Sequence, residues 1–115
     1  MTGSTEATIN AFNDAFGRHE VDAVMALMTD DCIFENTLPT PDGERHVGQK
    51  AVRKFWETFF TESPTASFET EEMVVAGDRA AVRWRFDWGD GHIRGIDLFK
   101  VRDGKVAEKL SYVKG

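Results

Sequence analysis

The C-terminal third of the chain constrains the fold most, because it reads as consecutive β-strands joined by tight turns. Strand-like runs span residues 81–88, 93–101 and 106–113. Short segments rich in turn residues separate them, GDG at 89–91 and RDGK at 102–105. In the first run aromatic and charged residues alternate, which indicates a strand with one buried face. The pattern predicts an antiparallel meander.

Apolar residues at helical spacing predict three helices before this meander. The first covers residues 6–16 and the second residues 21–28. The third is the most amphipathic, begins near Lys50 and stops before Pro64. Between the second and third helices we expect a polar break at Asp30-Asp31, a brief strand at 32–35 and an irregular, proline-rich loop at 36–48. Looser alternation over 66–76 predicts one more strand, so the fold class is α+β.

Composition excludes several classes of partner. The 115 residues carry a formal net charge of −6, which argues against binding to nucleic acid or to an anionic membrane. No apolar run approaches the roughly 18 residues of a membrane span, and the N-terminus lacks the order of a signal peptide. The single cysteine, Cys32, excludes an intramolecular disulfide and fits a reducing compartment. We therefore expect one domain over residues 1–115, located in the cytoplasm.

Asp97 is the most unusual residue of the meander, because it lies mid-strand between Ile96 and Leu98. A carboxylate there is unfavourable unless it is paired, exposed or functional. Alternation puts it on the same face as Phe99, and we expect this face to point inward. The alternative is an outward Asp97 in a surface ion pair with a nearby arginine. Ile96 and Leu98 lie on the opposite face, where two neighbouring apolar side chains would be exposed to water. This exposure predicts a homodimer contact through the outer face of the sheet.

The chain contains more aromatic bulk than a core of this size needs. One interpretation is a purely aromatic core. The functional interpretation is that several rings line a cavity between helix and sheet, with a few polar groups directed inward. Such walls favour a small, flat, hydrophobic molecule as the partner. The candidate ligand-binding residues are Phe12, Phe16, Phe34, Trp56, Phe59, Phe60, Trp84, Phe86, Trp88 and Phe99.

The order of elements, with DDCIFEN at 30–36 and GIDLFKVRDGKVAEKLSYV at 95–113, resembles the nuclear-transport-factor-two-like superfamily. Within it the chain is most similar to SnoaL-like polyketide cyclases and ketosteroid isomerases. The resemblance implies a cone-shaped, curved and mostly antiparallel sheet wrapped around a long helix, with two further N-terminal helices. It also implies a small-molecule pocket at the open end and, usually, a homodimer. It implies no single reaction, because the superfamily hosts isomerases, cyclases, dehydratases, hydrolases and assembly modules.

The catalytic groups of the ketosteroid isomerases are only partly present under this resemblance. The oxyanion-hole carboxylic acid falls on Asp97, but the helix tyrosine falls on Phe12 and the general base on Asn36. Steroid isomerisation by that mechanism is therefore not expected. The catalytic aspartate of the polyketide cyclases also resembles Asp97, which would act as acid and base on an enolisable carbonyl without metal or cofactor. Asn36 could orient a carbonyl or a water; its alternative role is a turn opening the proline-rich loop.

The phase of the last strand leaves two interpretations open. In the isomerase-like register Lys109 faces the cavity and could pair with Asp97 or polarise a carbonyl. In the other register Tyr112 faces inward and replaces the missing tyrosine as a hydrogen-bond donor. The two exclude each other unless a β-bulge intervenes.

These observations predict a cofactor-free isomerase, cyclase or dehydratase that acts next to the carbonyl of a hydrophobic cyclic compound. Asp97 would be its acid/base or oxyanion donor, assisted by Asn36 and by either Lys109 or Tyr112. The alternative is a non-catalytic ligand-binding or dimerisation module in which Asp97 is structural. No metal site is expected, because the three histidines are far apart and lack the spacing of metal motifs.

Overall fold

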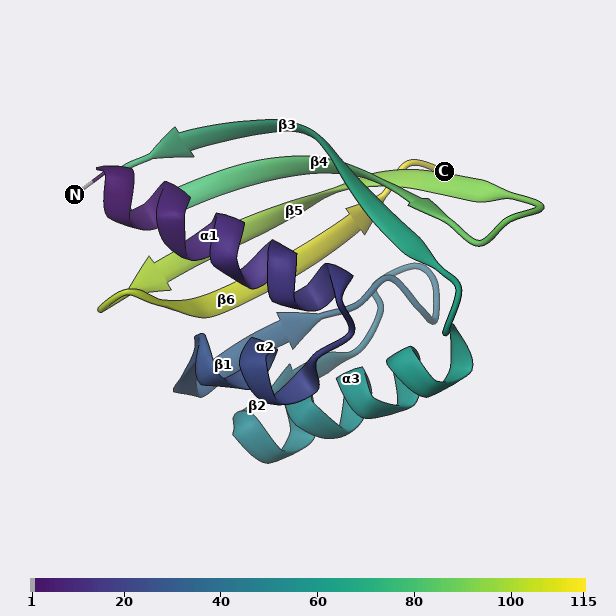
Figure 1. Ribbon diagram of the computed structural model, residues 1–115, viewed down its shortest axis with the longest axis horizontal. Coiled ribbons are helices and arrows are strands. Elements are labelled where there is room, and N and C mark those ends of the chain that lie inside the picture. Colours follow the sequence, from purple (N-terminus) through teal and green to yellow (C-terminus); the bar gives the residue numbers. More distant parts are fainter. Residues whose placement is uncertain (1) are drawn as a thin grey trace.

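A computed structural model describes residues 2–115, with side chains from residue 5 onward. The described residues form three helices and six strands (Figure 1). The helices are α1 (Thr2–Gly17), α2 (Val21–Ala26) and α3 (Gln49–Glu62). The strands are β1 (Met28–Glu35), β2 (Arg45–Val47), β3 (Ser67–Ala76), β4 (Arg79–Asp87), β5 (His92–Arg102) and β6 (Lys105–Val113). The α+β class predicted from the sequence is confirmed. No helix in this described part is long and apolar enough to cross a membrane.

All six strands belong to one curved sheet in the order β2-β1-β6-β5-β4-β3. The predicted meander, β3 to β6, is antiparallel throughout. The pair β1–β6 is parallel and joins the two ends of the chain in one sheet. Tight turns join the long strands. At the β5–β6 turn both Asp103 and Gly104 have positive φ, the conformation that matches the twist of a two-residue hairpin.

Helix α1 lies against the inner face of the long strands, whereas α3 packs on β1, β2 and α2 (Figure 1). The strong amphipathicity of α3 predicts that this helix lies across the sheet. It does cover the sheet, but only at the β1–β2 end, and the helix that spans β3 to β6 is α1. Helix α1 lies on the long strands because it buries its apolar stripe there, with Ile9 and Phe12 fully enclosed.

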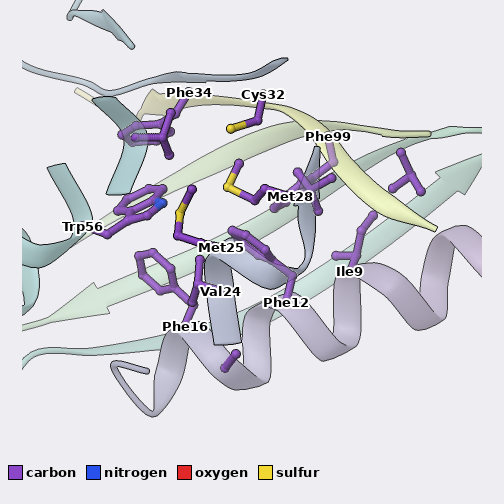
Figure 2. Packing of buried hydrophobic residues seen from close by; sticks show 14 of the residues in the cluster. Ile9, Phe12, Phe16, Val24, Met25, Met28, Cys32, Phe34, Trp56 and Phe99 are labelled. Carbon is purple, nitrogen blue, oxygen red and sulfur yellow. The ribbon is translucent and has the colours of Figure 1, made fainter. Parts of the chain in front are cut away.

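The hydrophobic core lies between α1, the short helix α2 and the inner face of the sheet. Figure 2 shows Ile9, Phe12 and Phe16 projecting from α1 toward the methionines of the α2–β1 region and toward Phe99 of β5. Trp56 of α3 and Phe34 of β1 close the core at the opposite end. Fully burying a side chain of this size contributes about 1.5–3 kcal/mol, so the packing of these elements stabilises the wall from which the site is built.

Two local predictions between α2 and α3 are wrong. Asp30-Asp31 does not break the chain: α2 ends at Ala26, and β1 runs through both aspartates. Their carboxylates are exposed, and Asp31 forms an ion pair with Arg102 at the end of β5. The proline-rich loop is not wholly irregular either, because its last residues form β2, which pairs with β1.

Candidate functional site

A cavity of about 610 Å³ opens between α1, α3 and the inner face of the sheet. This volume lies within the range of small-molecule sites. Aromatic rings from five elements supply half of its lining residues, and the loop after β1 forms its rim. The lining residues are Phe16, Phe34, Asn36, Thr37, Leu38, Pro39, Glu44, Phe55, Trp56, Phe59, Phe68, Trp84, Phe86, Ile93, Lys109 and Ser111.

A buried polar cluster of Asp97, Lys109 and Ser111 lies at the sheet side of this cavity. Lys109 Nζ is 3.1 Å from Asp97 Oδ2, and the Ser111 hydroxyl donates a hydrogen bond of 2.6 Å to Asp97 Oδ1. Lys109 Nζ also donates to Ser111 Oγ at 3.4 Å. Asp97 is 6% exposed and Lys109 7%. Both oxygens of the carboxylate are therefore held from β6.

The pairing of β5 with β6 explains why these three side chains share one face. Asp97 is directly opposite Ser111, and Phe99 is directly opposite Lys109. Residues directly opposite each other in an antiparallel pair project to the same side of the sheet. Ser111 and Lys109 therefore project inward with Asp97 and Phe99.

The Lys109 ammonium is enclosed by aromatic rings. Its nitrogen lies 5.0 Å from the ring centre of Phe34, 5.3 Å from Trp56, 5.4 Å from Phe16 and 6.0 Å from Phe99. Such cation–π contacts stabilise a positive charge that has lost its water. Among residues 5–115, Asp97 supplies the one carboxylate within ion-pair distance of Lys109.

Asp97 does not itself line the large cavity. It faces a neighbouring hollow of about 50 Å³, which Asn13 and Thr70 also line. Lys109 and Trp84 border both spaces. Lys109 therefore lies between the carboxylate and the large cavity, and a ligand in that cavity meets the ammonium group first.

The prediction that the Tyr112 side chain faces the cavity is wrong. Its side chain is 54% exposed and lies opposite Ile96, on the outer face of the sheet. The register that pairs Asp97 with Ser111 puts Tyr112 on the side away from the cavity. Of the two residues that the sequence left as alternatives, Lys109 is the one at the cavity.

Asn36 lies at the cavity rim, where it closes the loop. Its side-chain Oδ1 accepts a hydrogen bond of 2.7 Å from the Glu44 N–H, and its own N–H donates to the Glu44 carbonyl at 3.1 Å. Gly43 is required beside it, since a Cβ there would lie 1.9 Å from the Asn36 carbonyl oxygen. Because Oδ1 is used by the loop, the amide NH₂ is the part of Asn36 that remains to contact a ligand.

Six of the ten predicted aromatic residues line the large cavity and four do not. Phe12, Phe60 and Phe99 are buried in the core instead. Trp88 follows the end of β4 and is 44% exposed. The six at the cavity are Phe16, Phe34, Trp56, Phe59, Trp84 and Phe86.

Eight lining residues were not among the predicted site residues, and three of them, Phe55, Phe68 and Ser111, belong to the aromatic wall or to the polar cluster. Phe55 belongs to the apolar stripe of α3. Phe68 lies opposite Phe86 in the β3–β4 pair, which alternation alone could not align. Ser111 follows Lys109 by two residues and therefore shares its face.

The side chains that could hold a metal ion and the single cysteine are two further kinds of reactive group. Residues 5–115 contain no group of three or more histidine, cysteine or acidic side chains that could hold a metal ion. Cys32 is fully buried in the core, and burial raises the pKa of its thiol, which opposes a nucleophilic role.

Comparisons with known proteins agree with this architecture. A family model of SnoaL-like domains matches residues 9–109. An NTF2-like protein of unknown function from Mesorhizobium loti is 42% identical, with a TM-score of 0.88 over 99% of this chain and 93% of that chain. No curated protein matches the sequence.

Two more distant structures share the fold. A candidate ketosteroid isomerase from Kribbella flavida is 22% identical, with a TM-score of 0.85 over 99% of this chain and 80% of that one. A candidate polyketide cyclase from Sinorhizobium meliloti is 23% identical, with a TM-score of 0.80 over 92% and 94% of the two chains. At these identities the likeness concerns the fold and not the reaction.

Proposed function

This chain belongs to the SnoaL-like domain family, and we propose that it is an enzyme that transfers protons next to the carbonyl group of a hydrophobic, cyclic compound. The reaction would be an isomerisation, a cyclisation or a dehydration, all of which pass through an enol or enolate. The observation that carries the proposal is the buried pair of Asp97 and Lys109 beside an aromatic cavity.

A buried ion pair is poor evidence of a purely stabilising role. Removing two charges from water costs several kcal/mol per ion, and well-packed apolar residues often give equal or better stability. Lys109 is surrounded by aromatic rings that could have continued into an apolar core. Charged groups kept in such a place, at a cavity of ligand size, are typical of a functional site.

The geometry suits a division of roles. An N–H of Lys109 would donate to the carbonyl oxygen and stabilise the negative charge that develops there. Asp97 lines the adjoining hollow and not the cavity itself, so it would take the proton from the neighbouring carbon through a water molecule in that hollow and return it to another carbon or to a leaving oxygen. Ser111 holds the carboxylate in place. The aromatic wall excludes water, which strengthens these electrostatic contacts.

Proton exchange tests this proposal without knowledge of the natural substrate. Cyclic ketones that raise the melting temperature of the protein are incubated with it in D₂O, and NMR follows deuterium incorporation next to the carbonyl. We expect at least one bound ketone to exchange, and Asp97→Asn to slow exchange by about 10²–10⁴-fold. The exposed turn variant Asp90→Asn is the matched control. Equal exchange by the wild type and Asp97→Asn would contradict the proposal, as would bound ketones that do not exchange.

The second candidate function is a ligand-binding module without catalysis. It is favoured by the completeness of the polar network, because both Asp97 oxygens and Oδ1 of Asn36 have partners within the protein. For such a module, ketones would bind without exchange. Asp97→Asn would then lower the stability of the protein and leave no activity to lose.

A further inference from the structure

We infer that Lys109 is a covalent site, whose amine condenses with the carbonyl carbon of the ligand to form an imine. The inference rests on the proposed function only for the class of ligand, a carbonyl compound. It replaces the hydrogen bond from Lys109 to the carbonyl oxygen with a covalent bond to the carbonyl carbon, and it can be tested without turnover.

Lys109 differs from every other lysine in its surroundings. The chain has six lysines. Lys50, Lys54, Lys105 and Lys114 are exposed, and Lys100 is on the outer face of the sheet. Among residues 5–115, Lys109 is the one lysine that lines the large cavity. A ligand bound there is therefore held against a single primary amine.

Lys109 meets the two geometric requirements for attack on a carbonyl carbon, which are access to the ligand and an acceptor for its proton. Its nitrogen borders the large cavity, where four aromatic rings surround it. The amine attacks in its neutral form, so the ammonium, which the rings stabilise at rest, must first lose a proton. The proton must also have an acceptor, and Asp97 Oδ2 lies 3.1 Å away. When a hydrophobic ligand displaces water from the cavity, the separated charges lose solvation and transfer of the proton to Asp97 becomes easier.

Asp97, which contacts the Lys109 nitrogen, carries every proton in this reaction. Asp97 takes a proton from the Lys109 ammonium, and the nitrogen lone pair forms a bond to the carbonyl carbon as the π electrons move to oxygen. Asp97 returns its proton to that oxygen, which gives a carbinolamine. It then takes a proton from the nitrogen and gives it to the hydroxyl, which leaves as water. The products are a protonated imine, an Asp97 carboxylate and one water molecule.

This outcome preserves the charges of the resting site. The ammonium and carboxylate are replaced by a protonated imine and the same carboxylate, so the aromatic rings still surround one positive charge. The protonated imine draws electrons from the neighbouring carbon and makes its C–H bond more acidic. Asp97, which Ser111 holds through Oδ1, would then be free to accept that proton.

Reductive trapping tests the inference. The wild-type protein is mixed with a flat aromatic aldehyde and sodium cyanoborohydride, which reduces an imine to a stable amine. Mass spectrometry of the digested protein then locates the adduct. We expect labelling of Lys109 at least about tenfold faster than of exposed Lys54, because the cavity raises the effective concentration of the carbonyl at the amine. Asp97→Asn, checked for folding by circular dichroism, should slow labelling of Lys109 and leave Lys54 unchanged.

Labelling of Lys109 no faster than of Lys54 overturns the inference. The wild type alone decides this point, so the result does not depend on whether a Lys109→Arg variant folds. An adduct on Lys109 without deuterium exchange of any ketone would retain the covalent site and contradict the proposed function. Deuterium exchange of a ketone without an adduct on Lys109 would support the proposed function and overturn the covalent site.

Discussion

At the scale of single residues, Asp97 and Lys109 depend on each other for their stability in the fold. Each charge is almost fully removed from water, and each is the closest opposite charge to the other. Removing one partner leaves a buried charge without compensation, which typically costs 3–5 kcal/mol, whereas replacing both is often neutral. We therefore expect Lys109→Met to lower the free energy of unfolding by about 3–5 kcal/mol, and the double variant Lys109→Met/Asp97→Leu to recover most of this loss.

Urea unfolding of the wild type, both single variants and the double variant measures this coupling as a double-mutant cycle. The pair Arg53 and Asp22 is the matched control, because its nitrogen–oxygen distance is 2.7 Å but it lies at the surface. Its coupling should be no more than about 1 kcal/mol. If the two single changes at the buried pair simply added, Asp97 and Lys109 would not stabilise each other.

At the scale of elements, Gly95 determines how closely Trp84 can lie on the sheet. The two residues are directly opposite in the β4–β5 pair. A Cβ at position 95 would lie 2.4 Å from the Trp84 ring and 2.3 Å from the Tyr112 carbonyl oxygen. Because the backbone cannot move without breaking the β5–β6 pair, a larger residue should push the indole toward the cavity.

Gly95→Ala should therefore destabilise the protein by about 1–3 kcal/mol through overpacking and weaken ligand binding in the cavity. Gly17→Ala is the control, since no atom lies within 4 Å of a Cβ there. Urea unfolding gives the first quantity, and a thermal-shift titration with a bound ketone gives the second. A Gly95→Ala protein as stable as Gly17→Ala would show that the strand can adapt.

The same elements show what the sequence could predict. The meander was predictable because alternation of side chains is local, and it also placed Asp97 beside Phe99. Which residues of β6 face inward was not predictable, because this depends on the register of its pairing with β5. Asp30-Asp31 gives the local signal of a break, because Arg102, the partner of Asp31, lies 71 residues away in the sequence. Likewise, nothing local distinguishes Phe12 of the core from Phe16 of the cavity wall, since both belong to one apolar stripe of α1.

At the scale of the whole molecule, the outer face of the sheet carries exposed apolar residues in neighbouring strands. Leu98 of β5 is 41% exposed and lies between Leu110 of β6 and Ala81 of β4. Ala81 in turn lies opposite Val74 of β3, which is also exposed. We propose that a second copy of this chain covers the face. Charges of both signs flank the apolar row, as in the Arg83–Glu72 pair. A two-fold contact brings such a surface against itself, so opposite charges can meet.

The proposed dimer makes a direct prediction about size in solution. Light scattering coupled to size-exclusion chromatography should give twice the mass of the 115-residue chain for the wild type and a single mass for Leu98→Glu. A carboxylate at position 98 would have to be buried in the apolar part of the contact, which costs far more than an apolar contact gains. Leu38→Glu is the control, because Leu38 is 65% exposed but lies at the cavity rim; this variant should remain dimeric. Circular dichroism must show that Leu98→Glu is folded. A monomeric wild type, or a folded Leu98→Glu protein that stays dimeric, would contradict a contact through this face.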